Sequence, residues 1–252
     1  MIEIIRKRGP FVCEEIWFAE KPVDINNCDY VTFKGYNNCI DAKDFETEEF
    51  STSIIDLTQE LDVIWKKMDK SSCRWAINKA EKEGIKVDIA KSQTEFDEFY
   101  EMYLSFLKNK KLGAPIGKKY LLDGILFIAK LNDELLAGNL YFSDGHSFRW
   151  YIGASKRLIV DKQKASLIGC ANKLLVWDAI KYAKSKGTQI FDLGGVYLGE
   201  NKNDERIFIN KFKLSFGGEY KVTYNYIKYY SRLLKFFGKN TILVDIIRKL
   251  LK

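Results

Sequence analysis

The residues best suited to chemistry lie in one short stretch, Gln189 to Gly195, which reads QIFDLGG. Its apolar residues predict a strand, and Asp192 stands near the end of that strand, before the pair Gly194 and Gly195. Because ligands bind at the carboxyl edge of the sheet in α/β proteins, an acid followed by two glycines there predicts a ligand site. The alternative is that the glycines only form a turn. The sequence alone leaves both interpretations open.

A helix must hold this strand in place. A helical pattern of apolar residues extends from about Asn172 to Lys186, and Gly187 ends it. The small residues between Ser166 and Asn172 predict a loop before that helix. A strand, a small-residue loop and a helix amino terminus together bind pyrophosphate, because free backbone N–H groups and the helix dipole converge there. The chain contains no Walker A or dinucleotide-binding motif, which argues against nucleotide hydrolysis and hydride transfer.

The earlier part of the chain predicts a mostly antiparallel sheet. Residues 1 to about 55 give short extended segments separated by Asn, Asp and Gly. Ser92 and Glu95 form a capping-box pattern, which predicts a helix. After that helix, three apolar segments joined by turns predict three successive antiparallel strands between Ile125 and Ala154.

Length and composition indicate an ordinary globular protein. With 252 residues and 46% hydrophobic content, the chain is long enough for one substantial core or two smaller ones. The first residues do not resemble a secretory signal, and no apolar run is long enough to span a bilayer. The five cysteines are odd in number and widely spaced, which predicts reduced thiols, no disulfide and no metal site. We therefore expect a cytoplasmic protein.

The net charge of +7 is unevenly placed, because most of the excess lies beyond Gly218. This basic segment also carries many tyrosines, phenylalanines, isoleucines and leucines. It could lie on an anionic membrane or along nucleic acid. The alternative, which we favour, is a packed pair of helices with a solvated basic face.

Several motifs agree in type and order over roughly residues 53 to 218. They are Ile54-Ile-Asp56-Leu57, Arg74 through Asn78-Lys-Ala-Glu-Lys-Glu-Gly84, Asn172 with Leu175 and Trp177, Phe191-Asp192-Leu-Gly-Gly195, and Phe212-Lys213 with Phe216-Gly-Gly218. Taken together, they resemble the FemAB-like branch of the GNAT N-acetyltransferase superfamily.

The resemblance implies an α+β fold with a GNAT-like mixed, largely antiparallel central sheet flanked by helices. It implies a small incomplete N-terminal α/β half at residues 1–90 and an acyltransferase domain at residues 91–219. Residues 220–252 would form a basic, aromatic, helical C-terminal tail.

The resemblance also implies transfer of an activated acyl group to a primary amine. We expect acyl-CoA as the donor and a nucleotide-linked amino sugar for cell-surface polysaccharide as the acceptor, rather than nucleic acid. In the FemAB enzymes proper the donor is aminoacyl-tRNA and the acceptor is a peptidoglycan precursor, which is the second hypothesis. This chain is shorter and has no long heptad arm, which favours acyl-CoA. A noncatalytic binding module is the third hypothesis. Peripheral membrane contact through the tail and a homodimer are further expectations.

Site residues follow from the same resemblance. Asp192 would hold or deprotonate the acceptor ammonium, with capping of the Gly-Gly turn as the alternative. The phenol of Tyr151 would orient substrate or protonate the leaving thiolate, with a core tyrosine as the alternative. The expected donor-binding residues are Ser166, Gly169, Cys170, Asn172, Lys173 and Lys213, the last of which would pair with a phosphate. The expected acceptor-binding residues are Arg74, Lys79, Trp150, Gly194 and Gly195.

Overall fold

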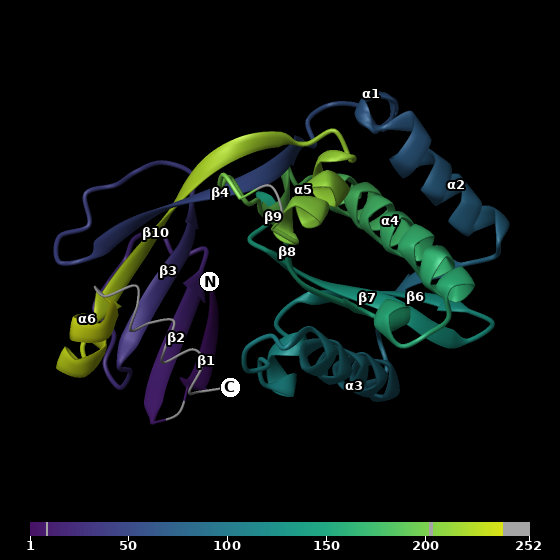
Figure 1. Cartoon of the computed structure of the whole chain (residues 1–252). Coiled ribbons are helices and arrows are strands. Elements are labelled where there is room, and N and C mark those ends of the chain that lie inside the picture. Colours follow the sequence, from purple (N-terminus) through teal and green to yellow (C-terminus); the bar gives the residue numbers. More distant parts are fainter. Residues whose placement is uncertain (9, 202–203, 239–252) are drawn as a thin grey trace. The chain divides into compact units, whose positions relative to one another are not determined.

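The computed structural model describes residues 1–8, 10–201 and 204–238, and the chain divides into two compact units (Figure 1). The first unit comprises Met1–Phe50, Gly113–Gly117 and Val222–Lys252. The second comprises Ser51–Leu112 and Lys118–Lys221. Both units are assembled from separate segments, whereas the division at residues 90 and 219 is continuous in sequence. That division stays a prediction.

The first unit is a small sheet with its own core. Its hydrogen-bonded strand order is β1 (Ile2–Arg8), β2 (Phe11–Trp17), β3 (Tyr30–Tyr36) and β10 (Glu219–Tyr229). β2 and β3 are parallel, and the other neighbours are antiparallel. The buried side chains of Ile16, Val31, Phe33 and Tyr226 fill the core. The short extended segments predicted for residues 1 to about 55 are therefore confirmed as strands.

The tail predicted to be helical begins instead as strand β10. Tyrosine, valine, threonine and isoleucine favour an extended backbone, and the strand buries Tyr226 completely. A short helix follows, α6 (Arg232–Gly238). Residues 239–252 of the predicted tail lie outside the described residues.

The second unit contains a mixed, largely antiparallel sheet, which confirms the predicted fold class. Its strand order is β4 (Glu46–Asp56), β9 (Ile190–Gly195), β8 (Ser147–Ser155), β7 (Glu134–Ser143), β6 (Ile125–Leu131) and β5 (Lys86–Ile89). Only β8 and β9 pair in parallel, and all other neighbours are antiparallel. The three successive antiparallel strands predicted from the sequence are β6, β7 and β8.

Helices cover both faces of this second sheet. They are α1 (Leu61–Lys67), α2 (Trp75–Lys82), α3 (Gln93–Lys110), α4 (Lys162–Ser185) and α5 (Arg206–Leu214). In Figure 1, α4 lies on one side of β6 and β7 and α3 lies on the other. The predicted capping box of α3 is present, because Ser92 and Glu95 bond to each other's backbone N–H groups.

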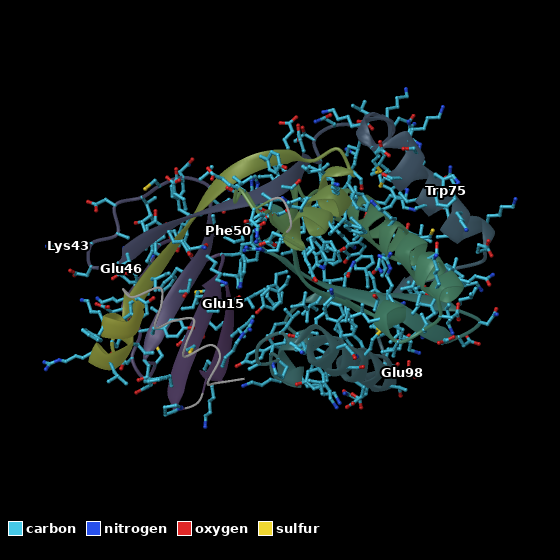
Figure 2. All side chains as sticks on the ribbon, viewed as in Figure 1. Glu15, Lys43, Glu46, Phe50, Trp75 and Glu98 are labelled. Carbon is cyan, nitrogen blue, oxygen red and sulfur yellow. The ribbon has the colours of Figure 1, made fainter. Side chains whose placement is uncertain are left out.

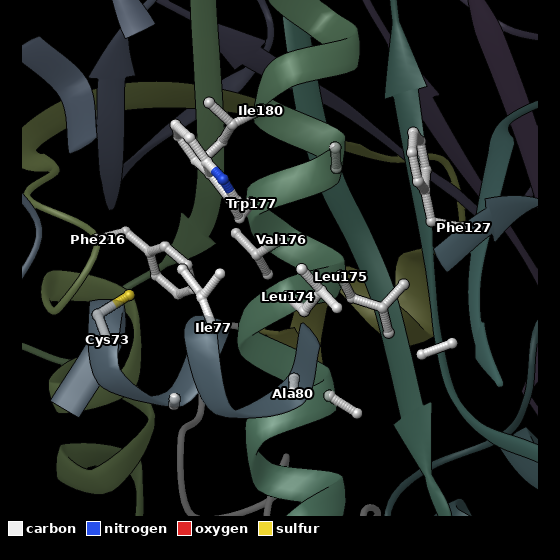
Figure 3. Packing of buried hydrophobic residues seen from close by; sticks show 14 of the residues in the cluster. Cys73, Ile77, Ala80, Phe127, Leu174, Leu175, Val176, Trp177, Ile180 and Phe216 are labelled. Carbon is white, nitrogen blue, oxygen red and sulfur yellow. The ribbon is translucent and has the colours of Figure 1, made fainter. Parts of the chain in front are cut away.

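The core of the second unit lies where α2 and α4 pack against the sheet. Figure 3 shows Ile77 and Ala80 of α2, and Cys73 just before α2, facing Leu174 and Val176 of α4. Two short turns complete the region, the π-helical turn η1 (Lys70–Arg74) and the 3-10 turn η3 (Lys156–Leu158). This packing fixes α4 and, through the chain that follows it, the start of β9.

The loop predicted from Ser166 to Asn172 is wrong, because these residues lie inside α4. The helix begins at Lys162, where the Asp161 side chain accepts hydrogen bonds from the backbone N–H groups of Gln163 and Lys164. The small residues of this segment serve close helix packing, since Cys170 and Ala171 are buried against the core. Backbone N–H groups inside a helix are already hydrogen-bonded and cannot bind pyrophosphate.

Candidate active site

The carboxylate of Asp192 lies in a buried polar cluster that we call the Asp192 network: Asp192, Arg149 and Thr52. Arg149 stands directly opposite Asp192 in the parallel β8–β9 pair and forms an ion pair with its Oδ2. The hydroxyl of Thr52 on β4 donates to Oδ1. All three residues are at most 8% exposed. The network therefore ties three neighbouring strands together.

Both oxygens of the Asp192 carboxylate are occupied. Oδ1 also accepts the backbone N–H of Gly194 at 2.7 Å. A carboxylate that already accepts from a guanidinium, a hydroxyl and an amide has little capacity left for a substrate ammonium. These contacts favour the alternative that Asp192 caps the Gly-Gly turn, while its role in catalysis stays a prediction.

Gly194 allows a close approach of three segments. Its φ of +84° lies in the left-handed region. A Cβ at this position would lie 3.2 Å from Lys213 Nζ and 3.4 Å from the carbonyl oxygen of Trp150. The turn at the end of β9 therefore needs glycine for its backbone conformation, and a Cβ there would also press against the Lys213 ammonium.

Beyond Arg149 and Asp192, β8 and β9 stop pairing, and we call this place the divergence point. The backbone carbonyls that follow are taken by side chains. The indole N–H of Trp150 donates to the Ile152 carbonyl at 3.0 Å. The ammonium of Lys213 donates to the Gly195 carbonyl at 2.7 Å. Two backbone carbonyls near the divergence point therefore accept hydrogen bonds from side chains.

Lys213 lies on α5, and its positive charge lies in partly buried surroundings. Burial, and after it the nearby Arg149 guanidinium, lower the pKa of Lys213 to about 8, while Asp192 opposes the shift. Its Nζ is 5.9 Å from the centre of the Trp150 ring. We call Lys213, Trp150 and Gly195 the Lys213 site. An ammonium with one hydrogen bond to the fold has two N–H groups left for a ligand.

A second lysine, Lys173 on α4, is buried and held entirely by the fold. Its ammonium donates to the Phe212 carbonyl at 3.3 Å and to the Ser215 hydroxyl. It also lies 4.4 Å and 4.9 Å from the ring centres of Phe212 and Phe216. Burial lowers the pKa of Lys173. This lysine satisfies the carboxyl end of α5 and so fixes the helix that carries Lys213.

The fold was compared with known proteins. No protein-family model matches the chain, and no curated protein sequence matches it. Among solved structures, FemX is similar at 13% identity and TM-score 0.63, over 93% of this chain and 85% of that chain. The C-terminal domain of a candidate lysylphosphatidylglycerol synthetase from Agrobacterium fabrum is similar at 12% identity and TM-score 0.59, over 94% and 84%. L-PGS from Bacillus licheniformis is similar at 18% identity and TM-score 0.54, over 86% and 72%.

The fold is similar to that of FemX and of the two lysylphosphatidylglycerol synthetase structures. In this FemX-like fold, the predicted donor-binding residues of α4 are engaged locally. Asn172 donates its amide to the Ile168 carbonyl at 3.0 Å, and Cys170 is buried with its thiol pKa raised by desolvation. No hydrogen bond or ion pair joins Ser166, Gly169, Cys170 or Asn172 to the Lys213 site within the described ranges. Their donor-binding role stays a prediction.

The remaining predicted residues are Tyr151, Lys79 and Arg74. The ring of Tyr151 stacks on Phe142 with centres 4.3 Å apart. On α2, the Lys79 ammonium lies 5.2 Å from the centre of the exposed Trp75 ring. Arg74, in the turn before α2, is partly buried. Of the predicted residues, the structure brings together Asp192, Trp150, Gly194, Gly195 and Lys213.

Arg149 and Thr52 are the residues that the sequence did not single out. One signal was available, because Arg149 is the lone charge between apolar residues in a segment predicted to be a strand. A buried arginine requires a counter-ion, and Asp192 at the end of another strand is a natural candidate. The register that joins them is a property of the folded sheet.

Residues 1–8, 10–201 and 204–238 contain no group of three or more metal-binding side chains. In the same ranges, no helix has the length and hydrophobicity to cross a lipid bilayer.

Proposed function

We propose that the protein is an N-acyltransferase whose reaction centre is the Lys213 site. The observation that carries this proposal is the position of the Lys213 ammonium, bonded to the Gly195 carbonyl where β8 and β9 diverge. The carboxyl edge of a sheet at a strand separation is a usual place for a ligand. The FemX-like fold supports a transferase of this class.

The reaction requires little covalent chemistry from the protein. The acceptor amine attacks the acyl carbonyl, and the carbon–sulfur or carbon–oxygen bond to the leaving group breaks. The amine loses one proton and the leaving group gains one. Negative charge develops on the carbonyl oxygen during the attack. The Lys213 ammonium is a hydrogen-bond donor that stabilises this oxygen. With a pKa of about 8, Lys213 carries its proton at neutral pH.

The donor that we propose is acyl-CoA, and the acceptor is the primary amine of a nucleotide-linked amino sugar for cell-surface polysaccharide. Support for a thioester arm comes from the divergence point, where the carbonyl of Ile152 accepts from the Trp150 side chain. An amide N–H group of such an arm can bond to this carbonyl when the Trp150 side chain moves, while Lys213 keeps its bond to Gly195. Arg74 and Lys79 offer positive charge for phosphates.

A second candidate is an aminoacyl-tRNA-dependent transferase that acts on a peptidoglycan precursor. The similarity to FemX over 93% of this chain favours it, because the match includes the first unit as well as the second. The two candidates share the Lys213 site and differ in the donor and in the acceptor.

One experiment separates them. The purified protein is incubated either with acetyl-CoA and a panel of nucleotide-linked amino sugars or with aminoacyl-tRNA and a peptidoglycan precursor. Release of free thiol with one sugar, lost in Lys213→Met, supports the acyl-CoA hypothesis. Aminoacyl transfer without thiol release supports the second candidate. Binding without turnover of any donor contradicts both and leaves a noncatalytic module.

A further inference from the structure

A groove of about 640 Å³ lies between α3 and the strand–turn segments that face it, within the second unit. One wall is a stripe of α3 at helical spacing, from Thr94 to Asn109. The other wall comes from the β6–β7 turn, the end of β8 and η3. The volume is in the range of small-molecule sites. The groove shares no residue with the Lys213 site.

The groove is acidic, although the chain as a whole carries a net charge of +7. A single ammonium, that of Lys156, lines it, against five carboxylates. The five are Asp97, Glu98, Glu101, Asp133 and Glu134.

Two of these carboxylates are already neutralised by the fold. Asp97 forms an ion pair with Lys118. Glu134 pairs with Lys156 at 3.2 Å and with Lys164 at 2.7 Å, and the hydrogen bond from Lys164 is the main cause of the lowered pKa of Glu134.

The other three carboxylates have no direct partner among the described residues, although Glu98 and Asp133 interact electrostatically with Lys130 at longer range. Within the described part of the chain, Glu98, Glu101 and Asp133 form no ion pair or hydrogen bond through their side chains. Glu98 and Glu101 are neighbours on α3, where Figure 2 labels Glu98. Asp133 stands in the turn on the opposite wall, with a φ of +66°. Unpaired negative charge therefore faces the groove from both sides.

The groove also offers apolar surface for the body of a ligand. Met102 and Leu135 are buried beneath it, at 6% and 5% exposure. Leu158 and Ile159 stand at its edge with 45% and 56% of their surface exposed. A ligand that covers these side chains removes apolar surface from water.

We propose that this groove binds an aliphatic amine that carries at least two positive charges. Its ammonium groups meet the carboxylates of the two walls, and its methylene chain lies on the apolar floor. Phosphate-bearing ligands such as CoA, nucleotides and tRNA are disfavoured here by the same charges. The site goes beyond the proposed function, because its charge excludes the anionic donor and acceptor of that reaction.

The test is a binding titration with hexane-1,6-diamine, followed by isothermal calorimetry and by amide chemical shifts in the full-length protein. Hexane-1,6-diol has the same carbon chain without charge and is the matched ligand control. We expect the diamine to bind at least ten times more tightly than the diol and to shift amides of Glu98, Glu101 and Asp133. The double variant Glu98→Gln/Glu101→Gln should weaken diamine binding by roughly three- to tenfold, as two partly exposed ion pairs allow.

The control variant Asp62→Asn/Glu81→Gln removes the same charge from α1 and α2, outside the groove, and should bind the diamine as the wild type does. Ile159→Ser should weaken binding of the diamine by shrinking the apolar edge. Equal affinity for diol and diamine overturns the proposal, as does wild-type affinity in Glu98→Gln/Glu101→Gln. Displacement of the diamine from the groove by adenosine diphosphate also overturns it.

Discussion

Asp192 and Lys213 bring opposite charges to the same end of β9, and the fold uses them differently. The Asp192 carboxylate is consumed by Arg149, Thr52 and the backbone N–H of Gly194. The Lys213 ammonium makes one hydrogen bond, to the Gly195 carbonyl, within the part of the chain that the structure describes. A fully satisfied ion is a structural element, whereas a partly satisfied ion at a sheet edge is available to a ligand.

A position at the end of a strand does not by itself show that a residue binds a ligand. Asp192 and Gly194 stand where a ligand site is expected, but their contacts are with each other and with neighbouring strands. Lys213 comes from a helix that follows β9 and reaches back to it. Chemistry at this edge therefore depends on the turn that the Asp192 network stabilises.

Breaking the Asp192 network should give the largest change in stability. Asp192→Ala leaves the Arg149 guanidinium buried without its counter-ion, and we expect the free energy of unfolding to fall by about 3–5 kcal/mol. Urea unfolding monitored by circular dichroism measures this change. The double variant Arg149→Met/Asp192→Leu removes both charges, and it should recover most of the loss. A stable but inactive Asp192→Ala protein would instead return Asp192 to a role in proton transfer.

Removing the charge of Lys213 should lower activity and raise stability. Lys213→Met takes away the donor to the carbonyl oxygen, so kcat should fall by about a hundredfold. The same change removes a poorly solvated cation, so the free energy of unfolding at pH 7 should rise by about 1–3 kcal/mol, discounted for partial exposure.

The sign of that stability change can be tested with pH. The pKa of Lys213 in the folded protein, about 8, lies below the ordinary lysine value of 10.5. Between these values the unfolded chain binds more protons, so the wild type should gain stability as the pH rises from 8 to 10.5. Lys213→Met should lack this gain. An equal gain in the variant would assign it to another group.

Local signals predicted the elements around this site well. The capping box of α3 joins residues that are neighbours in the sequence, and the strands β6 to β8 are joined by short turns, so both follow from local pattern. The strand β9 and its Asp-Leu-Gly-Gly end were predicted for the same reason. The first of the two glycines does take the left-handed conformation that a turn requires.

The features that the sequence did not predict correctly depend on long-range packing. Small residues before Asn172 resemble a loop in the sequence, but in the fold they let α2 lie close to α4. The buried Tyr226 makes β10 part of a sheet, although its segment is as basic and aromatic as an amphipathic helix. The partnership of Arg149 with Asp192 depends on strand register, which no local pattern encodes.

The pH dependence of activity shows whether Lys213 acts as a charged hydrogen-bond donor or as a base. If the ammonium stabilises the carbonyl oxygen, activity should decline above pH of about 8, as Lys213 loses its proton. Lys213→Arg keeps the charge at any accessible pH, so the decline should move to higher pH, with kcat lowered by about tenfold because the guanidinium has a different shape. A rise in wild-type activity through the same pH range would make Lys213 a base instead.

The smallest effect on stability and activity is expected at Lys173, the buried lysine of α4. In Lys173→Met the new side chain has a similar volume and keeps contact with the rings of Phe212 and Phe216, so the free energy of unfolding should change by less than about 1.5 kcal/mol. The lost bonds to Phe212 and Ser215 loosen the end of α5, and kcat should fall by less than about tenfold. Parallel unfolding and turnover measurements on Lys173→Met and Lys213→Met test this. A hundredfold loss in a stable Lys173→Met protein would place Lys173, and not only Lys213, in the chemistry.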